Sequence, residues 1–96
     1  MKKELSRKKE KKDHHSKSLP PILYVDDDPD SQYLFRHHFS RWYHVYLAST
    51  VKDAFDLLEK EKILLVLSDE RMPGESGVSF LKTLSSRYPD IIRILM

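Results

Sequence analysis

The chain has 96 residues, of which 40% are hydrophobic and 33% charged, and its net charge is +2, so it has room for one domain and none for a second, output domain. Because cysteine is absent, disulfides, thiolate catalysis and cysteine-ligated zinc sites are excluded. The longest apolar run, Ile63 to Leu67, is too short to span a bilayer and the start of the chain lacks the apolar segment of a secretory signal, so we expect a cytoplasmic protein without a membrane partner.

Positive charge is concentrated at the start of the chain, where residues 1–20 carry eight Lys or Arg against three acidic residues. Residues 1–18 contain Leu5 as their only apolar side chain besides Met1, and a segment that buries no apolar surface cannot offset its ordering entropy. We predict a basic disordered tail over residues 1–20 and a mildly acidic folded domain over residues 21–96. The tail is expected to be a solubilising extension whose contacts with nucleic acid, where it makes any, are weak and nonspecific.

The first half of the folded region predicts a strand, a helix and a second strand. The apolar run Ile22–Val25 is typical of a buried parallel strand. Asp28 and Pro29 supply an N-cap and a residue suited to the first helical turn, so we predict a helix over residues 29–42. Residues 45–48 form the second strand. Apolar and aromatic side chains recur at helical spacing along this segment: Leu34, Phe35, His38, Phe39 and Trp42.

The second half continues the alternation of helices and strands. Ser49 or Thr50 can cap a second helix, and residues 63–67 form the third and most hydrophobic strand. A loop with Pro73 and Gly74 leads to a third helix, and residues 91–96 predict a fourth strand. The apolar residues of the second helix are Ala54, Phe55, Leu57 and Leu58, and those of the third are Val78, Phe80, Leu81 and Leu84.

Four strands that alternate with three helices predict an α/β fold. Such a pattern requires a doubly wound parallel sheet with right-handed crossovers and helices on both faces. Ligands of these sheets bind at the carboxyl ends of the strands, where successive crossovers change sides. The residues that follow each strand are therefore the candidate site.

Two of the predicted strands are followed directly by carboxylates. Asp26, Asp27 and Asp28 follow the first strand, whereas Asp69 and Glu70 follow the third. If these strands are neighbours, the carboxylates converge and repel one another unless they share a proton or a cation. Ligands that offer only oxygen favour Mg²⁺ or Mn²⁺, and an octahedral ion that keeps its waters leaves positions for a phosphate. This pattern indicates phosphoryl transfer to a nucleophilic carboxylate, for which Asp69 is the natural candidate.

Each acidic cluster taken alone also fits other roles. The first could simply cap a helix, and the second could belong to a surface loop. A haloacid dehalogenase-type phosphatase would need Thr or Val in place of Asp30, together with a cap region that this length excludes. An EF-hand loop would need Gly in place of Ser31 and Glu in place of His37. The pairing of both clusters with very apolar strands favours phosphoryl chemistry over all of these.

Two segments, ILYVDDD over residues 22–28 and LVLSDERMP over residues 65–73, together with Gly77, carry a family resemblance. From Pro21 to Met96 the chain resembles the receiver domains of bacterial two-component response regulators. The resemblance implies a flavodoxin-like fold and a phospho-accepting signalling module rather than an enzyme, with a histidine kinase or phosphotransfer protein as the phosphoryl donor. It further implies Asp69 as the phosphoacceptor and the following Mg²⁺ ligands: Asp26, Asp27, Asp69 and the backbone carbonyl of Arg71.

The chain also departs from the family pattern. In the family, a switch Ser or Thr follows the fourth strand and a Lys follows the fifth, and both positions would lie beyond Met96. We expect the usual last helix, strand and helix to be missing, which would leave the fourth strand as an unpaired edge and favour self-association. Two alternatives to an active receiver stay open. The chain could be a truncated or degenerate receiver that acts only as an interaction module, or a fragment of a longer regulator whose output domain is lost.

Overall fold

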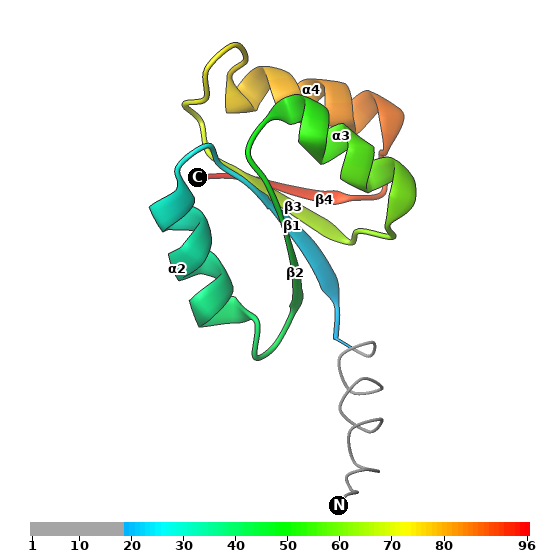
Figure 1. Cartoon of the computed structure of the whole chain (residues 1–96). Helices are drawn as coiled ribbons and strands as arrows, with labels where there is room; N and C mark the ends of the chain where they lie inside the picture. Colours follow the sequence, from blue (N-terminus) through cyan, green and yellow to red (C-terminus); the bar gives the residue numbers. More distant parts are fainter. Residues whose placement is uncertain (1–18) are drawn as a thin grey trace, which may run out of the picture.

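The computed structural model describes residues 19–96, so the expected tail lies, except for its last two residues, outside the described residues. No helix in this described part is long and apolar enough to cross a membrane. The elements follow the predicted order of strands and helices (Figure 1). They are β1 (Pro21–Val25), α2 (Pro29–Phe39), β2 (His44–Ala48), α3 (Val51–Lys60), β3 (Leu65–Ser68), α4 (Gly77–Arg87) and β4 (Ile92–Leu95).

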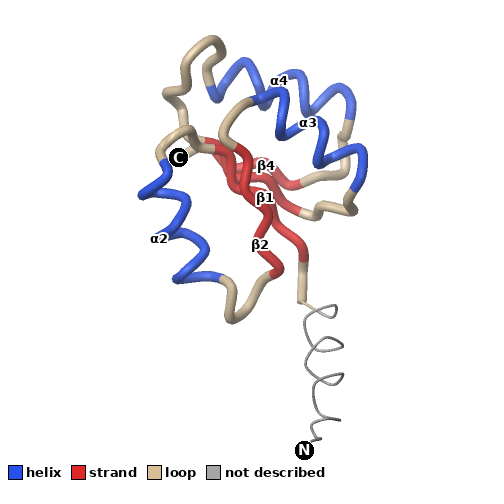
Figure 2. The backbone as a smooth tube through the Cα atoms, in the orientation of Figure 1, coloured by secondary structure: helices blue, strands red, loops and turns tan. Residues whose placement is uncertain are grey.

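The four strands form one parallel sheet in the order β2-β1-β3-β4. Val25, the last residue of β1, pairs with Ala48 at the end of β2 and with Ser68 at the end of β3. The carboxyl ends of three strands therefore reach the same edge of the sheet. Helices α3 and α4 lie on one face and α2 on the other (Figure 2). The predicted doubly wound α/β fold is confirmed.

Alternation along β1 divides the core into two layers. Leu23 and Val25 point toward α3 and α4, where Phe80 is fully buried, whereas Ile22 and Tyr24 point toward α2. The layer beneath α3 and α4 is the larger of the two. Its buried members are Leu23, Val25, Ala48, Ala54, Leu58, Ile63, Val66, Phe80 and Leu84, and the layer beneath α2 consists of Ile22, Tyr24, Phe35 and Val45.

Each helix begins with a side-chain cap. Asp28 accepts a hydrogen bond from the backbone N–H of Asp30 at the start of α2. Thr50, one of the two predicted candidates, accepts from Asp53 N–H at the start of α3. At α4 the cap is Ser76, which accepts from the third residue of that helix. These caps satisfy backbone N–H groups that have no partner within the helix, and they fix the residue at which each helix begins.

The first helix is shorter than predicted, and of the side chains that recur at helical spacing only Phe35 is buried. The helix ends at Phe39, whose carbonyl accepts the N–H groups of Trp42 and Tyr43 in a turn that leads into β2. Leu34 is 54% exposed and Trp42 is 56% exposed. Among the described residues α2 is the sole helix on its face of the sheet, so one line of its side chains is enclosed and the rest meet solvent.

One smaller prediction also needs correction. The third strand begins at Leu65 rather than at residue 63, because Ile63 packs into the core ahead of the strand while Leu64 is half exposed. This difference changes neither the topology nor the position of the strand ends.

Gly77, the first residue of α4, makes a close approach to the loop that follows β3. A Cβ atom at this position would press on the backbone carbonyl oxygen of Asp69 and would lie 3.0 Å from Cα of Glu70. The Gly77 N–H also donates to the Glu70 carbonyl at 3.0 Å. Only glycine fits, because two of the three nearest atoms belong to backbone that cannot rotate aside, and the third is Leu95 Cδ1 at 2.7 Å.

We predict that Gly77→Ala lowers the free energy of unfolding by about 1–3 kcal/mol, the usual cost of overpacking. Alanine normally favours a helix over glycine, so a loss of stability here identifies the steric cause. Urea unfolding monitored by circular dichroism measures the change. The matched control is Ser86→Ala, an exposed site on the same helix, which should not destabilise the fold. A Gly77→Ala chain as stable as the parent would contradict the close contact.

Candidate functional site

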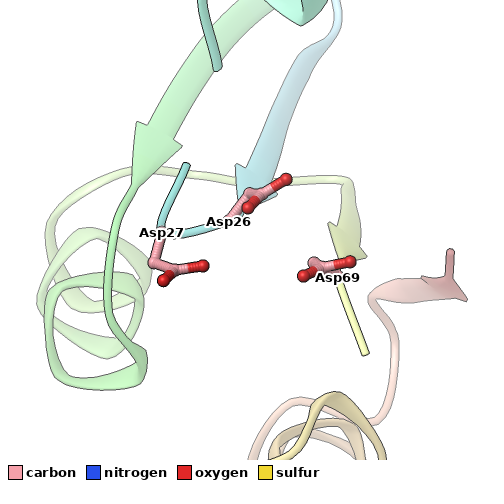
Figure 3. A group of neighbouring side chains, drawn as sticks. All are labelled: Asp26, Asp27 and Asp69. Carbon is pink, nitrogen blue, oxygen red and sulfur yellow. The ribbon is translucent and has the colours of Figure 1, made fainter. Parts of the chain in front are cut away.

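Asp26, Asp27 and Asp69 form one cluster at the carboxyl ends of β1 and β3. Each offers a carboxylate oxygen, and these three atoms lie within 4.8 Å of one another. Figure 3 shows the side chains gathered around one space beside the strand ends. Asp26 is buried, Asp69 is half-buried and Asp27 is exposed, so the cluster opens to solvent on one side. The convergence predicted from the two acidic segments is confirmed.

Backbone hydrogen bonds hold two of these aspartates in place. The N–H of Asp26 donates to the carbonyl of Ala48 at 3.0 Å, and the N–H of Asp69 donates to the carbonyl of Val25 at 2.9 Å. Both bonds extend the sheet ladder one residue past the strand ends. The positions of the acidic side chains are thus set by strand pairing rather than by free loops.

The carboxylate of Asp26 has two hydrogen-bond donors of its own. The Tyr24 hydroxyl donates to Oδ2 at 2.6 Å, and the Asp28 N–H donates to Oδ1 at 3.0 Å. Burial raises the pKa of Tyr24 well above its ordinary value, and the hydrogen bond to Asp26 and the nearby carboxylates, including Asp69, raise it further. The phenol therefore stays protonated at neutral pH and acts as a donor.

Gln32, in the first turn of α2, connects the ends of β1 and β2. Its side-chain amide donates to the Asp26 carbonyl at 2.6 Å, to Ser49 Oγ at 3.0 Å and to the Ala48 carbonyl at 3.3 Å. Neither Tyr24 nor Gln32 is among the site residues predicted from the sequence. Tyr24 could have been suspected, because it lies two residues before Asp26 on the same face of a strand. The partners of Gln32 are up to 17 residues away, and no local pattern indicates them.

Asp28 and Glu70, the remaining acidic residues of the two segments, have structural roles. Asp28 caps α2 and accepts a hydrogen bond from the Ser31 hydroxyl at 2.8 Å, which is the main cause that lowers its pKa below the ordinary value. Glu70 Oε1 accepts from the Val78 N–H at 3.2 Å and so ties the loop to the start of α4. The loop runs on through Arg71, whose side chain is exposed.

The three clustered carboxylates lack a basic partner within the described part of the chain, where both ion pairs lie elsewhere, between Lys52 and Asp56 and between Arg87 and Glu59. Three carboxylates this close repel one another strongly unless a cation or a shared proton offsets their charge. The donor set consists of oxygen alone, which suits Mg²⁺ or Mn²⁺ and disfavours zinc. The residues present therefore fit a hard divalent cation.

Comparison with known proteins identifies the family. A model described as the response regulator receiver domain matches residues 22–96, which is most of the chain and includes all three clustered aspartates. The chain belongs to the response regulator receiver domain family. The flavodoxin-like fold expected of such a domain agrees with the observed sheet order and helix layers.

Individual relatives support this assignment over most of the chain. The hydrogenase transcriptional regulatory protein HoxA of Cupriavidus necator is 37% identical over 75 residues, which are 78% of this chain and 16% of the relative. A signal receiver domain of an HD domain-containing protein from Pseudomonas fluorescens Pf-5 has a TM-score of 0.76 at 28% identity, over 80% of this chain and 57% of that one. The MaeR response regulator bound to beryllium trifluoride has a TM-score of 0.74 at 32% identity, over 81% of this chain and 66% of that one.

This receiver domain thus spans a small part of the length of its curated relatives. Receiver domains act as phospho-accepting signalling modules of two-component systems and generally bind Mg²⁺ in an acidic pocket. The cluster of Asp26, Asp27 and Asp69 has the composition and the position in the fold that such a pocket needs.

We predict that Gln32→Met lowers the free energy of unfolding by about 1–2 kcal/mol, because methionine fills similar space but leaves the carbonyls of Asp26 and Ala48 without this donor. Guanidinium unfolding followed by circular dichroism provides the measurement. Leu34→Met, an exposed change on the same helix, is the control and should leave stability unchanged. Equal stability of the two variants would show that the bridge contributes nothing.

Proposed function

We propose that Asp69 of this receiver domain accepts a phosphoryl group from the phosphohistidine of a histidine kinase or a phosphotransfer protein in a Mg²⁺-dependent reaction. The observation that carries the proposal is the approach of Asp26, Asp27 and Asp69 to within 4.8 Å at the edge of the sheet where this family has its acidic pocket. The Mg²⁺ ligands would be carboxylate oxygens of these three residues together with the backbone carbonyl of Arg71. The ion would offset the repulsion between the nucleophile and the incoming phosphoryl oxygens.

The hydrogen bonds around the cluster favour Asp69 over Asp26 and Glu70 as the nucleophile. Both carboxylate oxygens of Asp26 accept hydrogen bonds, and Glu70 is turned toward α4. Within residues 19–96 the carboxylate of Asp69 accepts none, and its half-buried position leaves it open to a donor. In the transfer, an Asp69 oxygen would bond to phosphorus, the P–N bond would break and its electron pair would stay with the imidazole, to give an aspartyl phosphate.

A direct test uses acetyl phosphate with Mg²⁺ and intact-mass measurement of the folded chain. We predict one phosphoryl adduct on the parent chain, none on Asp69→Ala and none when EDTA removes the metal. Asp30→Ala, which removes an exposed carboxylate outside the cluster, should be labelled like the parent. An adduct that persists in Asp69→Ala would show that another residue is the phosphoacceptor. A folded parent chain that takes no label would support a degenerate receiver that serves only as an interaction module.

We further propose that the receiver domain self-associates through β4. Within the described residues β4 is an edge strand. Its three apolar side chains and the residue that follows it are all exposed: Ile92, Ile94, Leu95 and Met96. Ile94 also borders an apolar groove beneath α2 that Phe39 and Leu67 line. An unpaired apolar edge offers both backbone and side-chain surface to a second strand.

Sedimentation equilibrium over a range of concentrations tests this association. We predict a monomer–dimer equilibrium that Ile94→Lys shifts toward monomer, because a charge on an edge strand opposes pairing. Tyr33→Lys places the same charge on an exposed site of α2 and should leave the equilibrium unchanged. A chain that stays monomeric at every concentration, or dimers that Ile94→Lys does not weaken, would rule out the β4 edge.

A further inference from the structure

Tyr24 occupies an unusual place for a polar side chain, since it lies inside the core yet reaches the acidic cluster. Its side chain is 5% exposed, and its ring stacks on Phe35 with the centroids 4.2 Å apart and the planes 5° from parallel. Its hydroxyl emerges at the end of β1 and donates to Oδ2 of Asp26 at 2.6 Å. The tyrosine therefore joins the apolar layer beneath α2 to a carboxylate of the site.

We propose that Tyr24 is a positioning residue for the metal site. Its hydroxyl holds the Asp26 carboxylate in the orientation that a divalent cation requires. The inference rests on the proposed function only for the presence of a metal site and not for phosphoryl transfer. It concerns a residue that acts through Asp26 and does not itself touch the ion.

The geometry around Asp26 explains how this positioning works. A carboxylate has about four lone-pair directions, and the Tyr24 hydroxyl and the Asp28 N–H take one on each oxygen. Rotation of the carboxylate would break one or both bonds, so its remaining lone pairs keep fixed directions. Groups that hydrogen-bond to metal ligands orient those ligands and raise metal affinity in this way.

A phenol has an advantage over a basic residue in this position. Lys or Arg next to Asp26 would fix the carboxylate but would also place a positive charge beside the cation. The Tyr24 hydroxyl fixes it without adding charge, so the attraction of Asp26, Asp27 and Asp69 for a cation is kept. The stack on Phe35 restrains the donor, because the two rings lie face to face and both are buried.

The test is calorimetric titration of the full chain with Mg²⁺ in the absence of any phosphodonor. Tyr24→Phe keeps the ring and its stack but loses the hydroxyl, and we expect it to weaken Mg²⁺ binding about 10-fold. In labelling with acetyl phosphate it should raise the Mg²⁺ concentration for half-maximal rate and leave the rate at saturating Mg²⁺ close to that of the parent. A merely structural role would not separate these two quantities.

The chain offers a matched control in Tyr46→Phe. The Tyr46 hydroxyl also donates to a carboxylate, Glu61 Oε1 at 3.1 Å, but on the surface away from the cluster. This variant should bind Mg²⁺ like the parent. In an Asp26→Asn background, Tyr24→Phe should have no further effect on Mg²⁺ binding, since the proposed role acts through that carboxylate.

The outcomes separate this inference from the proposed function. Mg²⁺ binding that depends on Tyr24 in a chain that acetyl phosphate does not label would refute the phosphoacceptor and leave the inference standing. Equal affinities of Tyr24→Phe and the parent, or a parent that binds no Mg²⁺, would overturn the inference. If Tyr24→Phe does not fold, proton NMR of the parent chain provides the test. We expect the resonance of the buried Tyr24 hydroxyl to shift when the chain is saturated with Mg²⁺. A resonance that does not shift would overturn the inference.

Discussion

Electrostatic repulsion among three carboxylates is the constraint on which the site depends. Parallel pairing of β1 with β3 brings Asp26 and Asp69 to one edge, and the bond from Asp69 N–H to the Val25 carbonyl prevents them from moving apart. Folding energy from the apolar strands thus holds together charges that would otherwise separate. The stored repulsion would favour a cation at this edge, because a bound ion would remove a cost that the fold already bears.

The groups around the cluster form hydrogen bonds with it but do not neutralise its negative charge. Asp26, the most buried of the three, receives neutral donors on both oxygens, and Gln32 takes its backbone carbonyl as well. Neutral donors satisfy buried acceptors, which would be costly if left unpaired, but they leave the net charge in place. A lysine or arginine paired with the cluster would stabilise the empty site and compete with a cation.

The sequence predicts the elements well where a local cause dominates. Strand ends and helix starts are local, because an apolar run stops at Asp26 and Asp28 caps the helix that follows it, as Thr50 caps α3. The clustering of Asp26, Asp27 and Asp69 follows from the parallel topology alone.

Burial on α2 could not be predicted in the same way. Which of its apolar side chains are enclosed depends on what lies opposite them in space, and Leu34 faces solvent although its spacing suits a core. Contacts such as that between Gln32 and Ser49 join separate elements and leave no periodic signal.

The two faces of the sheet contribute separately to the same site. Asp26 is held through Tyr24 and its stack on Phe35, which belong to the layer beneath α2. Asp69 is held from the other side, where Gly77 brings the start of α4 against its backbone carbonyl. The layer beneath α2 is the smaller and more exposed of the two, so motion of α2 would disturb Asp26 before it disturbs Asp69. A partner that packs on α2 would thereby act on one side of the acidic cluster, whereas a partner on α4 would act on the proposed acceptor.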